Sequence, residues 1–311
     1  MLKRPNNPGV EVKKVKRLFL LSLLVSAVCS GTALVGGNII ANSALQSGGS
    51  SVAGSSTESS PVTKLGAGHT ILLDAWYNSQ KRLDPQGNQV YFHYKWNDEA
   101  DSGYSLLGEI FRSYGAETKM LYVAPTLNSL RDAKVYIIVS PDIPVKNPIP
   151  HYMEPEDAEQ IAEWVKAGGV LMIMENDPPN ADLHHLNLLS EKFGIHFNDV
   201  LRNHVVNDQF ESGKIEVPSG GPIFHDAHTI FMKDTCTISA KAPAAPVLTD
   251  KGDTMIAIAR YGKGTVFATV DPWLYNEYTD GHRLPASYDN YSAAKELVRW
   301  ILEQISRQVP V

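Results

Sequence analysis

Cysteine is scarce in this sequence: of 311 residues, only Cys29 and Cys236 are cysteines. If the N-terminal segment is cleaved during export, Cys236 is the only thiol left, and the mature chain cannot form an intramolecular disulfide. Packing must then supply its stability. Cys236 lies in the segment DTCTIS, without the glycines of a nucleophile elbow, which favours a buried structural thiol over a catalytic one.

Basic residues are also scarce beyond the N-terminus. The first 17 residues hold six basic residues and one acid, whereas the whole chain has a formal charge of −6, so the remainder is near −11. No basic run follows Arg17. Because nucleic acids are bound through clustered Lys and Arg, this composition argues against a nucleic-acid partner.

Familiar catalytic motifs are missing as well. The sequence has no G-x-x-x-x-G-K loop, no H-E-x-x-H helix and no G-x-S-x-G elbow. The pair His184-His185 does not replace them, because adjacent residues on a helix point about 100° apart and cannot readily chelate one ion. We therefore expect no cofactor and assign no metal ligand.

The N-terminus is typical of an export signal. Its basic start is followed by the apolar run LFLLSLLVSAV at residues 18 to 28, and Ala41 and Ala44 offer small residues for cleavage. We expect residues 1–45 to send the folded part to the periplasm or the exterior. Alternatively they remain as an anchor, since about 20 residues can span a bilayer, and this segment is then the only contact with the membrane.

The rest of the chain divides into a tether and one domain. Residues 46–63 are rich in Gly and Ser without apolar periodicity, which predicts a flexible linker. Within residues 64–311, strands expected near 69–74, 118–123, 134–139 and 170–174 alternate with helices expected from Asp101 or Ser102, from Glu154 and near 183–193. This alternation predicts an α/β domain whose mostly parallel central sheet has helices on both faces.

The C-terminal half is expected to add β structure. Residues 195–250 have no clean period and predict an irregular β-rich insertion over the sheet edge. Residues 254–260 and 264–270 flank Tyr261-Gly262-Lys263-Gly264, which favours a hairpin, and 291–307 predict an amphipathic helix.

Acidic or amide residues follow four of the predicted strands: Asp74, Asp142, Glu175 to Asp177, and Asp271. The carboxyl ends of parallel strands open into the ligand crevice, so these residues could converge. Four of them are candidate catalytic acids, because paired carboxylates divide general acid and base work or hold a hard cation: Asp74, Glu175, Asp177 and Asp271. The alternative is that each acid caps a helix or braces a loop.

Two further groups suit a sugar ligand. Asn203, in the segment RNHVVND, suits hydrogen bonds either to sugar hydroxyls or to loop backbone. Trp96 belongs to an aromatic-rich loop that suits either stacking on carbohydrate or packing as a lid on the core.

Four segments carry a family resemblance: HTILLDAWYNSQ at 69–80, YFHYKWND at 91–98, AEWVKAGGVLMIMEND at 162–177 and DPWLYNEYTDGHRLP at 271–285. Together they resemble the glutamine-amidotransferase-like domain appended to some unsaturated rhamnogalacturonyl hydrolases of pectin-degrading bacteria. The resemblance implies a flavodoxin-like fold of the class I amidotransferase type and a setting in the breakdown of acidic plant polysaccharide. Glutamine hydrolysis is not expected, because no catalytic Cys elbow can be assigned.

Two functions remain open at this point. The first is an exported carbohydrate-related protein that binds, and in one version hydrolyses, acidic oligosaccharides of the rhamnogalacturonan type, with a helical glycoside hydrolase as a candidate partner. The second is a non-catalytic sugar-binding module or envelope scaffold. Under the first, Arg283 pairs with a uronate carboxylate and Trp273 offers a stacking face. The expected ligand-binding residues are Asn78, Trp96, Asn203, Trp273, Asn276, Glu277 and Arg283.

Overall fold

The computed structural model describes residues 64–307. The expected export segment at 1–45 and tether at 46–63 lie outside the described residues. Among residues 64–307, no helix combines the length and apolar character that crossing a membrane requires.

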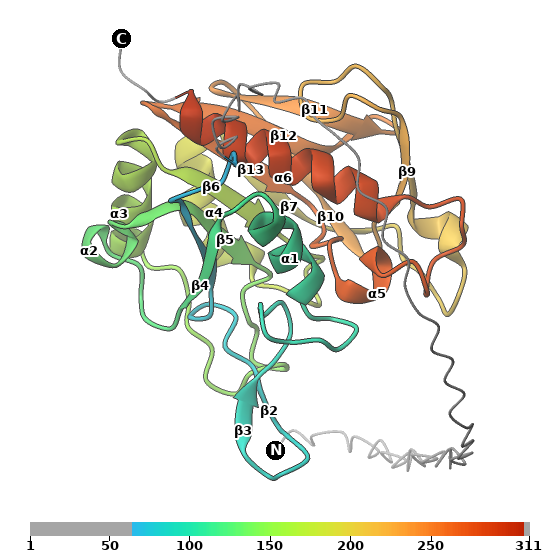
Figure 1. The fold of residues 1–311 in the computed structure, drawn as a ribbon, viewed down its shortest axis with the longest axis horizontal. Coiled ribbons are helices and arrows are strands. Elements are labelled where there is room, and N and C mark those ends of the chain that lie inside the picture. Colours follow the sequence, from blue (N-terminus) through green and yellow to red (C-terminus); the bar gives the residue numbers. More distant parts are fainter. Residues whose placement is uncertain (1–63, 308–311) are drawn as a thin grey trace, which may run out of the picture. The chain divides into compact units, whose positions relative to one another are not determined.

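Five parallel strands form the centre of the main sheet (Figure 1). In spatial order they are β4 (Glu117–Leu121), β1 (Thr70–Asp74), β5 (Ala133–Val139), β6 (Val170–Met174) and β13 (Gly264–Thr269). All four neighbouring pairs run parallel. The strand order reverses direction between β1 and β5, which is where open α/β sheets place their ligand crevice. The predicted α/β architecture with a mostly parallel centre is confirmed.

Antiparallel strands continue the sheet beyond β13. They are β12 (Asp253–Tyr261), β10 (Thr235–Ala240) and β7 (Ile195–Arg202), with β11 (Ala244–Asp250) also paired to β12. The prediction that residues 195–250 lie over the sheet edge is therefore wrong for β7, β10 and β11, which are members of the sheet. Ile238 and Phe197 face each other across the β10–β7 ladder and are both buried, so packing holds these short strands in the sheet. Within residues 195–250, β8 (Lys214–Val217) and β9 (His228–Phe231) pair with each other in a separate ribbon.

Helices cover both faces of the sheet. One face carries α1 (Ser105–Ser113), α5 (Asn276–Thr279) and α6 (Asn290–Ser306), and the other carries α2 (Leu127–Leu130), α3 (Pro155–Lys166) and α4 (Leu183–Ser190). Successive strand residues point to opposite faces. The Phe267 ring accordingly meets Trp300 of α6, whereas the Tyr136 ring meets Trp164 of α3.

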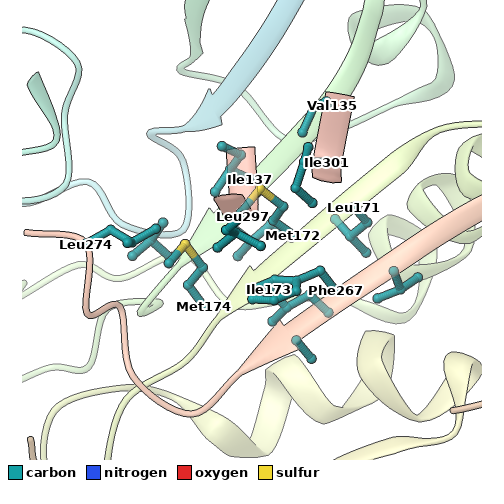
Figure 2. Packing of buried hydrophobic residues seen from close by; sticks show 14 of the residues in the cluster. Val135, Ile137, Leu171, Met172, Ile173, Met174, Phe267, Leu274, Leu297 and Ile301 are labelled. Carbon is teal, nitrogen blue, oxygen red and sulfur yellow. The ribbon is translucent and has the colours of Figure 1, made fainter. Parts of the chain in front are cut away.

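The core lies between the central strands and these helices. All five residues of β6 are buried, as expected for a strand covered on both faces. Figure 2 shows Leu297 and Ile301 of α6 beside the side chains of Val135, Ile137 and Met172. This packing fixes the strand ends that form the site.

Local signals set most helix ends. α3 begins at Pro155 with Glu156 and Asp157 in its first turn, as predicted. The predicted caps of α1, Asp101 and Ser102, are wrong: its N-cap is Tyr104, which makes no side-chain cap. The Leu106 N–H near its start is instead accepted by Asn276 Oδ1 at 3.1 Å, from a residue 170 positions away.

A small hairpin stands beyond the sheet. β2 (Lys81–Leu83) and β3 (Gln89–Tyr91) pair antiparallel and project at the bottom of Figure 1, away from the helices. They belong to the long aromatic loop between β1 and α1.

Candidate functional site

The four predicted catalytic acids are buried at or just beyond the carboxyl ends of their strands. Asp74, Glu175, Asp177 and Asp271 are each at most 2% exposed. A substrate in solution therefore does not reach them directly, and their contacts show what they do instead.

Asp74 closes the turn that follows β1. Its Oδ2 accepts from the backbone N–H groups of Tyr77 at 2.9 Å and Asn78 at 3.1 Å, and its Oδ1 accepts from the Tyr136 hydroxyl at 2.9 Å. Desolvation raises the pKa of Asp74 to about 6, against the effect of these hydrogen bonds. Asp74 therefore braces a loop.

A buried lysine lies beside this turn. Lys95 is fully buried, and its Nζ donates to Asn78 Oδ1 at 3.0 Å. The Asn78 Nδ2 donates to the Ser140 carbonyl at 2.8 Å, so Asn78 joins the ends of β1 and β5. Burial lowers the pKa of Lys95 to about 8, opposed by Asp74, Asp142 and Asp98. Asn78 is buried and its side-chain amide is used in these two hydrogen bonds, so it is not open to a ligand.

The next three acids each hold one neighbouring group. Glu175 Oε1 accepts from the Asn176 N–H at 3.0 Å, and Asp177 Oδ1 accepts from Asn180 Nδ2 at 2.5 Å. Asp271 Oδ2 accepts from the Lys233 N–H at 3.1 Å. Burial raises the pKa of all three carboxyl groups. Glu175 Oε2 and Asp271 Oδ1 have no hydrogen-bond partner among the described residues.

Cys236 lies among these acids and is fully buried. Desolvation and the nearby Glu175 carboxyl raise the pKa of its thiol, which opposes thiolate formation. The prediction of a buried structural thiol is confirmed in its burial.

A pocket of about 260 Å³ opens at this edge of the sheet. We call it the edge pocket. It is lined by His93, Tyr94, Ser102, Lys146, Asn176, Asn180, Lys233, Asp234, Tyr275 and Glu277. The buried acids accept hydrogen bonds from three of these residues: Glu175 from the backbone N–H of Asn176, Asp271 from the backbone N–H of Lys233, and Asp177 from the side-chain amide of Asn180. The buried acids thus fix the positions of residues that line the pocket.

The lining combines two lysines, two carboxylates (Asp234 and Glu277), amides and hydroxyls. Lys146 and Lys233 supply two ammonium groups, and burial lowers the pKa of Lys146 while Asp177, Asp142 and Glu175 raise it. Burial and the neighbouring Lys146 charge lower the pKa of His93 to about 4, so its imidazole is neutral at neutral pH. The hydroxyls of Tyr94 and Tyr275 lie 3.3 Å apart.

The backbone of this lining is strained. His93 and Tyr94 are consecutive non-glycine residues in the left-handed region, with φ of 59° and 47°. Such conformations cost about 1–3 kcal/mol each and persist where the surroundings impose them, commonly at functional sites. The strain agrees with a site that presents these two side chains.

Only one predicted ligand-binding residue lines the edge pocket, namely Glu277. Trp273 is fully buried, and Trp96 is 7% exposed with its Nε1 donating to the Lys119 carbonyl at 3.0 Å. Both rings therefore belong to the core and cannot stack on a ligand. For Trp96, the packing alternative holds.

The remaining three predicted residues contact other parts of the protein. Asn276 Nδ2 donates to the carbonyls of Asp98 and Ala100 at 3.0 and 2.9 Å. Asn203 has φ of 52° and donates to the Met232 carbonyl at 3.3 Å. Arg283 pairs with Asp208 at 2.9 Å on the surface. None of them lines a pocket described here.

Sequence reasoning missed the two lysines of the pocket. Lys146 and Lys233 lie on loops as single basic residues, without a pattern that marks them. A signal did exist for Tyr94, Asn176 and Tyr275, because they lie in the segments YFHYKWND, MEND and DPWLYNEY that carry the family resemblance.

Metal ligation was the alternative use of the acids. Within residues 64–307, no group of three or more His, Cys, Asp or Glu side chains is arranged to hold a metal ion.

Comparison with known proteins shows the fold alone. No protein-family model matches the chain, and no curated protein matches it. Among solved structures, the mmIFT52 N-terminal domain is similar at 19% identity over 69% of this chain and 91% of that one, with a TM-score of 0.52. The cytoplasmic protein STM1381 from Salmonella typhimurium LT2 is similar at 13% identity over 76% and 99%, with a TM-score of 0.50. The cytoplasmic protein STM3548 from Salmonella typhimurium reaches 18% identity over 76% and 98%, with a TM-score of 0.47.

Proposed function

We propose that this protein binds acidic oligosaccharides of the rhamnogalacturonan type in the edge pocket. The observation that carries the proposal is that Lys146 and Lys233 line one small pocket together with amide and hydroxyl groups and with the carboxylates of Asp234 and Glu277. Ammonium groups attract the carboxylates of uronic acids, and amides and hydroxyls exchange hydrogen bonds with sugar hydroxyls.

The burial of the acids indicates that they support ligand binding and do not act as catalytic acids. Burial raises the pKa values of Glu175 and Asp271 and keeps both residues out of contact with solvent. Their hydrogen bonds to Asn176 and Lys233 make them positioning residues. We therefore assign recognition to the lining and support to the acids.

Hydrolysis is the second candidate function. Asp234 and Glu277 both line the edge pocket, and two carboxyl groups on one pocket are what glycoside hydrolysis uses. Release of a reducing sugar by the purified protein, lost in both Asp234→Asn and Glu277→Gln, would support it.

The wider setting of the proposal rests on sequence. The basic and apolar N-terminus supports export to the periplasm or the exterior, with or without a retained anchor. The resemblance to domains appended to rhamnogalacturonyl hydrolases supports a class I amidotransferase-like ancestry and a helical glycoside hydrolase as a partner. Glutamine hydrolysis is not proposed, because the Cys236 thiol is buried.

Calorimetric titration of the full chain with rhamnogalacturonan fragments tests the proposal, with product analysis in parallel. Lys146→Ala and Lys233→Ala should each weaken binding about tenfold, since a charge-assisted hydrogen bond contributes about 1.5–3 kcal/mol. Lys263→Ala is the matched control, because Lys263 is exposed in the turn between β12 and β13, outside the pocket lining. No binding by the wild-type chain, or equal affinity in all three variants, would overturn the proposal.

A further inference from the structure

A second cavity, of about 480 Å³, lies against the β2–β3 hairpin. We call it the hairpin pocket. Lys81 of β2 and Gln89 and Tyr91 of β3 line it on one side, and the loop after β5 lines it through residues that include Asn147 and His151. No function has been given to it above.

The hairpin pocket adjoins the edge pocket. Lys146 lines both cavities, so its side chain lies at their junction. The edge pocket alone is smaller than the roughly 300–1,000 Å³ of typical small-molecule sites, whereas the hairpin pocket falls within that range. The two pockets therefore lie next to each other, with Lys146 between them.

A buried carboxylate holds three residues that line the hairpin pocket. Asp142 is fully buried, and its Oδ2 accepts from the Ser79 N–H and from Asn147 Nδ2, both at 2.8 Å. Its Oδ1 accepts from Gln80 Nε2 at 2.7 Å. All three donors belong to residues that line the pocket. Asp142 therefore acts here as Glu175, Asp177 and Asp271 act behind the edge pocket.

The ring of His151 is also held in place. It stacks on Trp76 with ring centroids 3.5 Å apart, and its Nδ1 lies 2.9 Å from the Trp76 carbonyl oxygen. On the opposite side, Lys81 Nζ lies 4.8 Å from the centre of the Tyr91 ring. The pocket thus offers aromatic faces, a cation and the amide of Gln89, which are groups that recognise an acidic sugar.

We propose that the hairpin pocket is a second sugar subsite, joined at Lys146 to the subsite in the edge pocket, so that the preferred ligand spans at least two sugar units. This inference rests on the proposed function and adds ligand length and a second set of contacts to it. Tyr91 and Gln89 belong to the second subsite alone, whereas Lys233 belongs to the first alone.

Affinity as a function of ligand length tests the inference. The full chain is titrated with galacturonic acid and with a rhamnogalacturonan fragment of four sugar units. We expect the fragment to bind at least about tenfold more tightly, because the second subsite adds several hydrogen bonds of about 0.5–1.5 kcal/mol each. Equal affinity for the two ligands would refute the second subsite while leaving binding at the first subsite intact. Failure of both ligands to bind would remove the proposed function together with the inference.

Two variants separate the subsites. Tyr91→Ala should lower affinity for the fragment toward that for galacturonic acid and leave affinity for galacturonic acid unchanged, whereas Lys233→Ala should weaken both. Gln89→Ala lies at an exposed position of the short strand β3 and serves as a second variant in case Tyr91→Ala misfolds. It should lower the affinity for the fragment about threefold and leave the affinity for galacturonic acid unchanged. Equal losses for both ligands in Tyr91→Ala and Gln89→Ala would contradict a separate subsite.

Discussion

Buried carboxyl groups at the carboxyl edge of the sheet hold loops in place through hydrogen bonds. Asp74, Asp142 and Glu175 each accept a backbone N–H from a loop residue close to a strand end. A buried carboxyl group that keeps such partners is tolerated, whereas an unpaired charge is expensive. At the scale of single residues, these acids determine where the pocket-lining groups stand.

Asp74 makes stability depend on pH in a way that can be measured. Its folded-state pKa is raised from 3.8 to about 6, so its contribution to folding is complete below about pH 3.8 and is lost as the pH rises through 6. Lys95, with its pKa near 8, titrates above this window. Asp74→Asn, which cannot ionise, should therefore gain stability relative to wild type between pH 4 and 7, by up to about 3 kcal/mol.

Urea unfolding of both proteins at several pH values measures this difference. Other titrating groups affect both proteins alike, so only the difference between the two curves reports on Asp74. A difference that stays constant from pH 4 to 7 would show that Asp74 keeps an ordinary pKa in the folded protein.

At the scale of elements, the β12–β13 hairpin fits tightly against the end of α3. A Cβ on Gly264 would lie 2.0 Å from the Val165 carbonyl oxygen and 2.5 Å from that of Gly169. Backbone atoms cannot move aside cheaply, so only glycine fits at the start of β13. This contact positions the strand that leads to Asp271.

Gly264→Ala should therefore destabilise the protein by about 2–3 kcal/mol, the upper part of the range of about 1–3 kcal/mol for forcing extra atoms into a packed region. Gly252→Ala is a matched control in the neighbouring β11–β12 turn, where φ is +90° but no atom lies within 4 Å of the added Cβ. It should cost only about 1 kcal/mol, from backbone strain. Thermal unfolding measures the stability of both variants. Equal losses of stability would show that the close contacts of Gly264 do not determine the cost of the substitution.

Elements with strong local signals could be predicted from the sequence. β1, β5, β6, α3 and α6 fall within a residue or two of their expected ranges, because apolar runs and the Glu154-Pro155 start determine them locally. The start of α1 could not be predicted, since its partner, Asn276, lies far away in the chain. β7 and β10 were missed as members of the main sheet for the same reason, because packing with distant strands holds them there.

At the scale of the whole molecule, the sequence predicted which edge of the sheet holds the proposed site but not the residues that line it. The rule that ligands bind at the carboxyl ends of parallel strands points to this edge of the sheet, where the edge pocket lies. The residues that line the edge pocket come from loops after five different strands, β3, β5, β6, β9 and β13, and from α5. Lysines such as Lys146 and Lys233 have no periodicity to mark them. The acids were conspicuous in the sequence, yet they lie behind the lining.

In the proposed complex, two neighbouring lysines hold a negatively charged ligand on a negatively charged domain. The whole chain has a formal charge of −6, and the residues beyond Arg17 have a net charge near −11. The overall charge of the domain therefore does not attract an acidic sugar. Recognition must then come from Lys146 and Lys233 within the pocket. The carboxylate of the ligand is the group on which this recognition depends.

The most direct measurement compares one rhamnogalacturonan fragment with its carboxyl-reduced form, titrated into the full chain and into the Lys146→Ala/Lys233→Ala double variant. We predict that reduction of the carboxyl groups weakens binding to the wild-type chain about a hundredfold, or about 3 kcal/mol, and changes binding to the double variant little. Equal affinity of the wild-type chain for the acidic and the neutral fragment would contradict the account.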